Sequence, residues 1–491
     1  YRRQRQMCIR DRIYAMAPRR NNVLPIAMMF ALFFLIAFVT GLPSPIGVII
    51  ARQFDATNFQ SQLGFFANFI AYAFMGIPSG MLLRRIGYKR TALAAIAVGF
   101  AGVGVQFLSA RAGSFGIYLT GAFISGFSLC MLNTVVNPML NLLGGGGRRG
   151  NQLIQFGGVF NSIGGTLAPM LVGYLMGAAA GRTLEKANPV FLLAMGIFLA
   201  AFVVLWFVRI PEPDCEEPVR MPRAKGVRGP FGFRHFVLGI VAIFLYVGIE
   251  VGIPSTANLY MTSYTGSQSE ELLAEYERQQ SDPAYLAAFL AEDASNETAA
   301  DYESRVVTPE MASKARRIAE GRESPGLGLP AAVAGTIVGL YWLLMLVGRL
   351  IGGAAGGRMS PRTMLAGVSA AALLLVVGAI FSPADFSVAL PARLGGTHVP
   401  FGILLLVLCG LCTSVMWGGI FNLAVAGLGE FTSLASGIFM VMVCGGGILP
   451  PLQGYIADAA GYTASYWVVF GGQLYILSLI HISEPTRPLY I

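Results

Sequence analysis

Two long apolar segments joined by a short turn of glycine and arginine place the strongest limit on how this chain can fold. The segments lie within residues 133–169, and the turn between them occupies residues 144–150. About 20 apolar residues in a helix cross the hydrocarbon core of a bilayer, and each segment continues far enough to do so. A helix also satisfies its backbone hydrogen bonds internally, as lipid requires. The sequence therefore predicts a transmembrane hairpin.

Side-chain amides recur on the apolar faces of this hairpin. Asn133, Asn137 and Asn141 are spaced four residues apart, so they lie on one face of the first helix. An amide in hydrocarbon is costly unless it is hydrogen-bonded, and such residues normally face the interior of a helix bundle or a wet cavity. A ligand with many hydroxyl groups would suit this face.

The hairpin also carries two motifs that resemble a known family. The first helix reads Asn-Pro-x-x-x-x-Leu-Gly from Asn137, and the second reads Gln-x-x-x-x-x-Asn-Ser from Gln155. These patterns closely resemble the fucose and glucose/galactose type sugar porter branch of the major facilitator superfamily, and the sequence from Trp417 to Asn422 adds to the likeness. The resemblance implies an all-α membrane protein with about twelve transmembrane helices in two six-helix pseudo-repeats.

The composition agrees with a membrane protein and argues against a nucleic-acid-binding one. The 491 residues are 55% hydrophobic and 12% charged, about half the charge of an ordinary soluble domain. The net charge is +9. Its basic residues lie in short loops between apolar runs, where membrane topology explains them, so we expect no nucleic-acid partner.

Cysteine and histidine spacing gives no sign of a metal site, a redox site or an enzyme. Cys409 and Cys412 have CxxC spacing, but they lie in an apolar run and are expected to be small buried side chains. None of the three histidines is at metal-ligand spacing from another. With no Ser/His/Asp or Cys/His constellation either, we expect no metal, no enzyme activity and no cofactor, apart from an H⁺ or Na⁺ coupling ion.

Three short sequence motifs occur twice along the chain, in the same order, and so indicate two related halves. They are Gly-x-Pro-Ser at residues 41–44 and 252–255, loops that begin at Arg85 and Arg358, and proline-containing helix segments at residues 167–175 and 449–456. Parallel repeats of this kind place a ligand near the membrane midplane, between the halves.

The domain boundaries follow from these spans. The N-terminal half takes residues 16–208, a cytoplasmic linker rich in proline and charge takes 209–230, and the C-terminal half takes 231–476. Residues 1–15 and 477–491 resemble translated sequencing-adapter sequence, and we expect a non-native leader and tail there.

A polar insert at residues 265–329 interrupts the C-terminal half. The spacing of Leu272, Leu273 and Tyr276 predicts short amphipathic helices outside the membrane. Counting the spans places the insert on the non-cytoplasmic face. We favour a solvated appendage, and the alternative is a lid over the ligand entrance.

A basic loop at residues 84–90 marks the cytoplasmic side, because loops on that side carry an excess of lysine and arginine. It resembles the superfamily's signature between helices 2 and 3, with Gly80, Arg85 and Gly87 matching, while Arg84 stands where an aspartate is usual. The residues expected to act in gating are Arg85, Gly87, Arg349 and Arg358.

Glu250 is the one carboxylate predicted deep within a span, and an acid there is a functional hypothesis by default. Two interpretations stay open: Glu250 couples H⁺ or Na⁺ to transport, or it is a structural partner of Arg349. The resemblance implies acids in helices 1 and 4, where this chain has Ser44 and Asn133. Serine and asparagine can still bind sugar hydroxyls, but they cannot carry a proton. Coupling would then depend on Glu250 or on Na⁺, or transport would be uncoupled.

The residues expected to contact the ligand are polar or aromatic and lie within spans. For each, the alternative is an interhelical hydrogen bond, worth about 0.6 kcal/mol on average. Tyr72 and Trp417 are expected to be apolar platforms for a sugar ring. The full set is Ser44, Asn68, Tyr72, Asn133, Asn137, Gln155, Asn161, Asn258, Trp417 and Asn422.

The sequence therefore favours a secondary active transporter of the bacterial inner membrane, multi-pass and monomeric in the lipid bilayer. It would import a small-molecule sugar, either a monosaccharide or a small saccharide, by cation-coupled alternating access. The alternatives are a porter of another polar solute, such as an amino sugar, a glycopeptide fragment or an organic acid, and a non-transporting sugar receptor.

Overall fold

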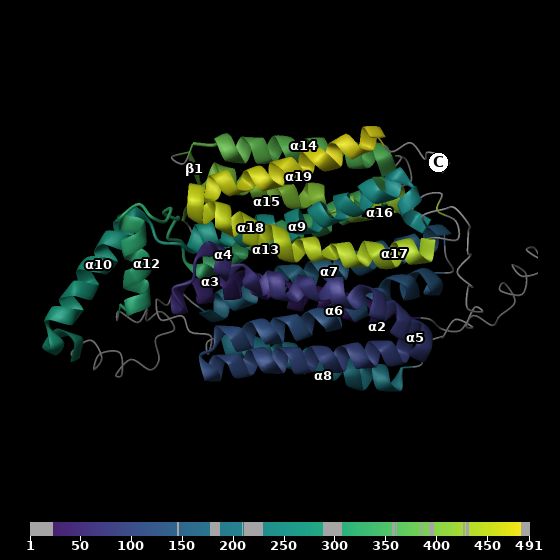
Figure 1. Ribbon diagram of the computed structural model, residues 1–491, viewed down its shortest axis with the longest axis horizontal. Helices are drawn as coiled ribbons and strands as arrows, with labels where there is room; N and C mark the ends of the chain where they lie inside the picture. The colour runs from purple at the N-terminus through teal and green to yellow at the C-terminus, as the bar shows by residue number, and fades with distance from the viewer. Residues whose placement is uncertain are drawn as a thin grey trace, which may run out of the picture.

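The computed structural model is a bundle of long helices with one small two-stranded hairpin (Figure 1). It describes residues 23–144, 147–176, 187–208, 229–287, 307–355, 361–383, 386–391, 397–425 and 432–482, together with positions 210, 359 and 428. Within these residues nine helices are long and apolar enough to cross a membrane, or ten with one bent pair taken as a single span. Two further helices, α7 and α19, complete twelve, and the predicted all-α fold is confirmed.

The first half begins with a span split by prolines. Pro43 and Pro45 lack backbone N–H groups, and the chain divides at Leu42 into α2 and α3. A capping box of Thr57 and Gln60 then starts the one-turn helix α4. The helices of this half are α2 (Val23–Gly41), α3 (Pro43–Gln53), α4 (Asn58–Ser61), α5 (Leu63–Ala112), α6 (Phe115–Leu143), α7 (Gly147–Met176) and α8 (Asn188–Phe207).

Helix α5 joins two spans across a tight turn at Gly87. The turn has φ 81°, a conformation that glycine adopts without steric penalty. From the start of α5 beside α4, about 24 helical residues at 1.5 Å each carry the chain roughly 36 Å to this turn. The basic loop at residues 84–90 therefore lies at the opposite end of the bundle from α4.

In the second half, two spans that were predicted as continuous helices are broken. The tenth span, predicted over residues 401–427, consists of α15 and α16, bent by 45°. Ser414 Oγ donates to the carbonyl of Leu411 at 2.7 Å near the break and so competes with the helix hydrogen bonds. The eleventh span, predicted over residues 434–457, is interrupted by a short 3-10 helix before a run of glycines.

The described elements of this half follow in chain order. They are η2 (Gly229–Gly232), α9 (Arg234–Thr262), α13 (Ala331–Ala355), α14 (Pro361–Phe381), β1 (Ser387–Ala389), β2 (His398–Pro400), α15 (Phe401–Thr413), α16 (Met416–Val425), α17 (Thr432–Val441), η5 (Met442–Cys444), α18 (Gly445–Ala460) and α19 (Tyr462–Ile482). β1 and β2 are antiparallel, with Val388 opposite Val399. Helix α19 crosses the predicted tail boundary at residue 476, and the predicted leader lies outside the described residues.

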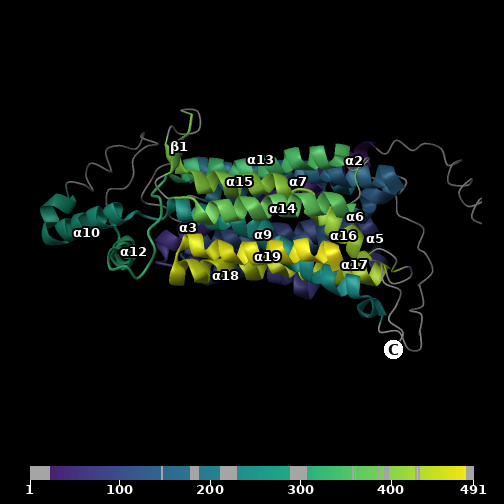
Figure 2. The ribbon, with the colours of Figure 1, turned by 90° about the horizontal axis from the view of Figure 1, so that it is seen from above.

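The polar insert contains two helices: α10 (Gly266–Ser281), where the spacing predicted a helix, and α12 (Pro309–Ala319), which that spacing did not cover. They project from the end of the bundle that holds α3 and α4 (Figures 1 and 2). A small apolar cluster that includes Met311 and Ile318 holds α12 against α10. The insert therefore lies at the opposite end of the bundle from the basic loop at residues 84–90, and its place on the non-cytoplasmic face stays a prediction.

The two halves meet along several helix pairs, among which α13 packs on α7, α18 packs on α4 and α5, α17 packs on α5, and α9 packs on α3. Glycines permit the closest of these approaches. A Cβ atom added at Gly335 would lie 2.5 Å from the carbonyl oxygen of Pro169, and one added at Gly173 would lie 2.7 Å from that of Ala331. Small residues of this kind allow the backbones of membrane helices to come close together.

Candidate functional site

Arg349 of α13 reaches across the boundary between the halves to α7. Its Nη1 atom donates to the carbonyl of Gly158, to Ser162 Oγ at 2.9 Å and, less closely, to Asn161 Oδ1 at 3.4 Å. Gly158 makes this possible, because a Cβ atom there would lie 3.2 Å from Arg349 Cδ. The guanidinium group therefore joins one half to the other inside the bundle.

Glu250 of α9 lies beside this arginine. Its Oε1 atom is 3.7 Å from Arg349 Nη2, and the side chains of Glu250 and Arg349 are 13% and 11% exposed. Charges this far from water require a partner, and the longer contact leaves Arg349 shared between Glu250 and α7. The structure gives Glu250 the partner that the sequence named, and its role in cation coupling stays a prediction.

Two tyrosines and a threonine surround the pair and were not among the predicted site residues. Tyr246 OH donates to the carbonyl of Thr413 at 3.1 Å, and Tyr341 OH lies 3.2 Å from Thr413 Oγ1. Thr413 ends α15, where a helix leaves carbonyls without intrahelical partners. Tyr246 precedes Glu250 by four residues, so helical spacing alone places both side chains on one face.

Trp417 of α16 lies next to this group, as a platform residue would. Its ring centroid is 6.3 Å from that of Tyr246 and 5.6 Å from that of Phe439. Trp417 follows the break between α15 and α16, which turns its helix relative to α15. The predicted neighbour on the same helix, Asn422, has a side chain outside the described part of the structure.

A second set of predicted residues is bonded within the first half. Asn133 Nδ2 donates to Tyr72 OH at 2.9 Å and to the carbonyl of Leu129 at 3.1 Å, and Asn137 Nδ2 donates to the carbonyl of Asn133 at 3.0 Å. Tyr72 is 2% exposed, so its ring is not an open platform in this conformation. These contacts are the interhelical and intrahelical bonds that formed the alternative interpretation.

Of the remaining predicted amides, one joins the halves nearer the insert and two lie within the first half. Asn258 Nδ2 of α9 donates to the carbonyl and the hydroxyl of Ser44 in α3, at 3.3 and 3.4 Å. Asn161 Nδ2 donates to the carbonyl of Phe33 at 3.3 Å, within the first half. Asn68 is buried, and its Oδ1 atom has no hydrogen-bond partner among the described residues.

The remaining predicted residues lie apart from these sets. Arg85 is exposed in the basic loop, Gly87 forms the turn of α5, and Arg358 lies outside the described residues, as does the side chain of Gln155. Among the described residues no group of three or more His, Cys, Asp or Glu side chains is arranged to hold a metal ion. Of the predicted residues, the structure thus brings together Glu250, Arg349, Asn161 and Trp417 around the middle of the bundle.

Comparisons with known proteins support the same architecture. The profile of the Major Facilitator Superfamily matches residues 29–276 and 282–487. A glucose/galactose transporter of Brucella abortus is 26% identical over 449 residues, which cover 90% of each chain. The L-fucose-proton symporter of Escherichia coli is 24% identical over 470 residues, covering 90% of this chain and 89% of that protein.

A solved structure has the same fold. The crystal structure of an Escherichia coli fucose:proton symporter matches 95% of this chain and 100% of its own, with a TM-score of 0.62 and 18% identity. Together with the apolar spans in two packed halves, these matches establish that this multi-pass inner-membrane chain belongs to the Major Facilitator Superfamily.

Proposed function

We propose that this chain imports a monosaccharide or a small saccharide by alternating access, with a cation as the driving ion. The relatives that match nine-tenths of the chain are named as transporters of glucose and galactose or of L-fucose, which supports the sugar class. Amides, hydroxyls and aromatic rings are the groups that bind the hydroxyls and ring faces of sugars.

The observation that carries the proposal is the polar contact between the halves at mid-depth. Arg349 of one half faces Asn161 and Ser162 of the other, beside Glu250 near the centre of α9. In transporters built from parallel repeats, substrate and coupling ions bind at this level between the repeats. A ligand held here contacts both halves and so can bias their relative position.

Glu250 is the proposed coupling residue. When Glu250 is ionised, its carboxylate attracts the guanidinium group of Arg349. When Glu250 is neutral, Arg349 interacts only with its acceptors on α7. Protonation or cation binding at Glu250 therefore changes how strongly Arg349 ties the two halves. Ser44 and Asn133 cannot take this part, because neither side chain carries an exchangeable charge near neutral pH.

Sugar counterflow in proteoliposomes tests the proposal. The panel contains glucose, galactose, fucose and an organic acid, and Glu250→Gln is compared with Glu320→Gln, an exposed acid on the insert. We expect the wild type to exchange one class of sugar. Glu250→Gln should keep exchange and lose gradient-driven accumulation at least tenfold, while Glu320→Gln keeps both.

Two results would contradict the proposed substrate class or the proposed coupling role of Glu250. A folded wild-type protein that exchanges no sugar contradicts the substrate class and directs the search to other polar solutes. Full accumulation by Glu250→Gln contradicts the coupling role and leaves Glu250 as a structural partner of Arg349.

A further inference from the structure

The loop between α3 and α4, which belongs to the first half, contains a residue in an unusual backbone conformation. Asp55 has φ 49° and is the non-glycine residue with positive φ in the described part of the chain. Aspartate and asparagine tolerate this left-handed region better than other residues with a Cβ atom. The loop thereby directs the Asp55 carboxylate toward the insert, which belongs to the second half.

Two side chains of helix α12, in the insert, bind this carboxylate. Arg317 Nη1 donates to Asp55 Oδ2 at 2.8 Å, and Arg317 Nη2 lies 2.7 Å from Asp55 Oδ1 as an ion-pair contact. Ser313 Oγ donates to Asp55 Oδ2 at 2.8 Å. Ser313 and Arg317 are four residues apart and so lie on one face of α12. Charge-assisted hydrogen bonds of this kind are stronger than those between neutral groups, so Arg317 holds the carboxylate firmly.

Further charges in the insert hold Arg317 in place. Its Nε atom lies 3.2 Å from Glu323 Oε2, and Lys314 Nζ lies 3.3 Å from Glu323 Oε1. Lys314 and Glu323 are each 5% exposed, whereas Asp55 and Arg317 are each 26% exposed. In this conformation the pair of Lys314 and Glu323 is shielded from water, and the contact that joins the halves is the one that water can reach.

The charge state of Asp55 favours this contact. Burial acts to raise the pKa of Asp55, but hydrogen bonds from Arg317 and Ser313, with the positive charges of Arg317 and Lys314, outweigh it and lower the pKa. The carboxylate of Asp55 is therefore ionised near neutral pH.

The insert is firmly joined to α9 and so moves with the second half. Backbone N–H groups of residues 326–329 donate to carbonyls of residues 260–264 at 2.7 to 3.0 Å. These carbonyls belong to the C-terminal end of α9, where a helix lacks its own donors. Arg317 is thus held at a defined place above the end of α9.

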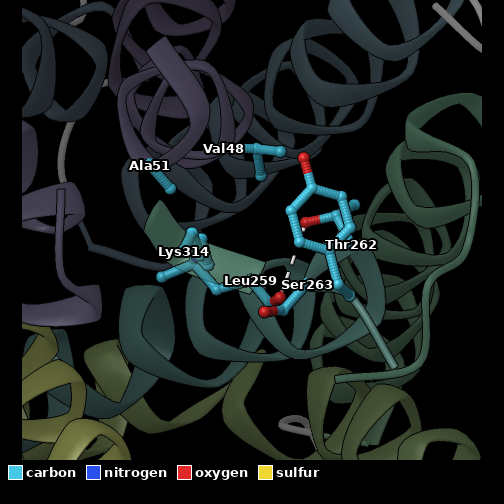
Figure 3. A pocket seen from close by; sticks show the side chains of 7 residues that line it. Val48, Ala51, Leu259, Thr262, Ser263 and Lys314 are labelled. Atoms are coloured by element: carbon cyan, nitrogen blue, oxygen red, sulfur yellow. Dashed lines mark hydrogen bonds between the residues drawn. The ribbon is translucent and has the colours of Figure 1, made fainter. Parts of the chain in front are cut away.

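A small pocket lies directly beneath α12, at the boundary of the two halves (Figure 3). Val48 and Ala51 of α3 line one side, and Leu259 and Thr262 of α9 line the other, with Lys314 of α12 beside them. Helices α3 and α9 are the first spans of the two halves. The insert helix therefore covers the non-cytoplasmic end of the boundary between them.

We propose that α12 is a gate on the non-cytoplasmic side, and that Asp55 and Arg317 are its latch. The structure holds this gate closed. Outward opening requires the latch to break, so that solute can enter between α3 and α9. The proposal rests on the proposed function for the nature of the solute, while the gating motion itself is tested without any sugar.

The test measures access to the pocket beneath α12. Val48 is 2% exposed, so a Val48→Cys variant reacts slowly with a membrane-impermeant maleimide while the gate is closed. The parent chain without this cysteine is the blank. Arg317→Gln and Asp55→Asn are expected to speed labelling about tenfold, a change of about 1.4 kcal/mol in the opening equilibrium. Asparagine preserves the left-handed backbone at position 55.

Arg322→Gln is the matched control. It removes the same charge from the insert, but Arg322 pairs with Glu320 in an exposed contact away from Asp55. Labelling of Val48→Cys in this control should stay within about twofold of the wild type, as for most exposed pairs. Equal labelling rates in Arg317→Gln, Asp55→Asn and Arg322→Gln would contradict the proposal that α12 is a gate.

A cysteine pair at the latch supplies the second measurement. Oxidation of Asp55→Cys/Ser313→Cys should stop counterflow, and a reductant should restore it, because the cross-link holds the gate closed. Counterflow that continues through the cross-linked protein contradicts the gate. Faster labelling in the latch variants of a protein that exchanges no sugar supports the gate and contradicts the proposed substrate instead.

Discussion

A pair of opposite charges lies at two of the contacts between the halves of this transporter, and these two contacts differ in their access to water. At the outer contact, Asp55 and Arg317 are partly exposed and have water nearby when they separate. At the middle contact, Glu250 and Arg349 are more deeply buried, and Arg349 is shared between the halves. Separating an exposed pair costs little, whereas leaving a buried charge alone costs several kcal/mol. The outer contact therefore suits repeated opening, and the middle contact suits a change of protonation or ligand.

The outer end also carries a helix cap beside the latch, made by a carboxylate of the other half. Asp458 of α18 accepts hydrogen bonds from the backbone N–H groups of Asn58 and Phe59, at 2.9 and 3.0 Å, and so caps α4 from the other half. Tyr462 OH donates to Asn58 Oδ1 at 2.9 Å. The closed outer end thus combines an ion pair with a helix cap that crosses the boundary.

The largest effect is expected from removing the middle cation. Arg349→Ala leaves Glu250 buried without its partner and should lower the free energy of unfolding by about 3 kcal/mol. Thermal unfolding of the detergent-solubilised protein measures this loss. Arg349→Ala/Glu250→Gln should recover most of it, because no unpaired charge remains. Arg85→Ala, an exposed residue of the basic loop, should leave the unfolding temperature unchanged.

An intermediate effect is expected from removing the cap across the outer end. Asp458→Ala leaves the first N–H groups of α4 without their acceptor, and loss of such a cap costs about 1 kcal/mol. Because the cap comes from the other half, the loss should appear as easier outward opening, with Val48→Cys labelled several times faster. Labelling as slow as in the wild type would mean that Asp458 only stabilises α4 locally.

The smallest effect is expected from moderate acid. The pKa of Asp55 is lowered, so the latch is fully present above the ordinary aspartate range near pH 3.9 and is lost only as the pH falls through the lowered value. The charged groups that face Asp55 are Arg317, Lys314 and Glu323. Labelling of Val48→Cys should therefore be unchanged between pH 7 and about pH 5. A marked rise over this interval would show that another group controls the outer contact.

Much of the fold followed from local pattern, because each span carries its own signal of length and hydropathy. Helix α10 of the insert followed from the spacing of Leu272, Leu273 and Tyr276, and Glu250 was matched with Arg349 as the two deeply placed charges. The break between α15 and α16 was missed, because a serine that bonds its own helix leaves hydropathy unaltered.

The latch was missed for a different reason. Asp55 and Arg317 are separated by 262 positions, and charged residues on an amphipathic helix ordinarily face water. Their pairing depends on how the insert docks, which residues 326–329 determine through backbone hydrogen bonds that carry little sequence signal. Likewise, Asn133 and Tyr72 were expected to face a ligand, and only their packing revealed that they bind each other.

The attachment of the insert to the end of α9 makes that helix a lever. Its 29 residues extend about 44 Å, so its outer end lies roughly 22 Å from its centre. A rotation of the second half by about 15° would carry α12 roughly 6 Å, more than twice the length of the hydrogen bonds to Asp55. A small rotation of one half against the other would therefore separate the latch completely.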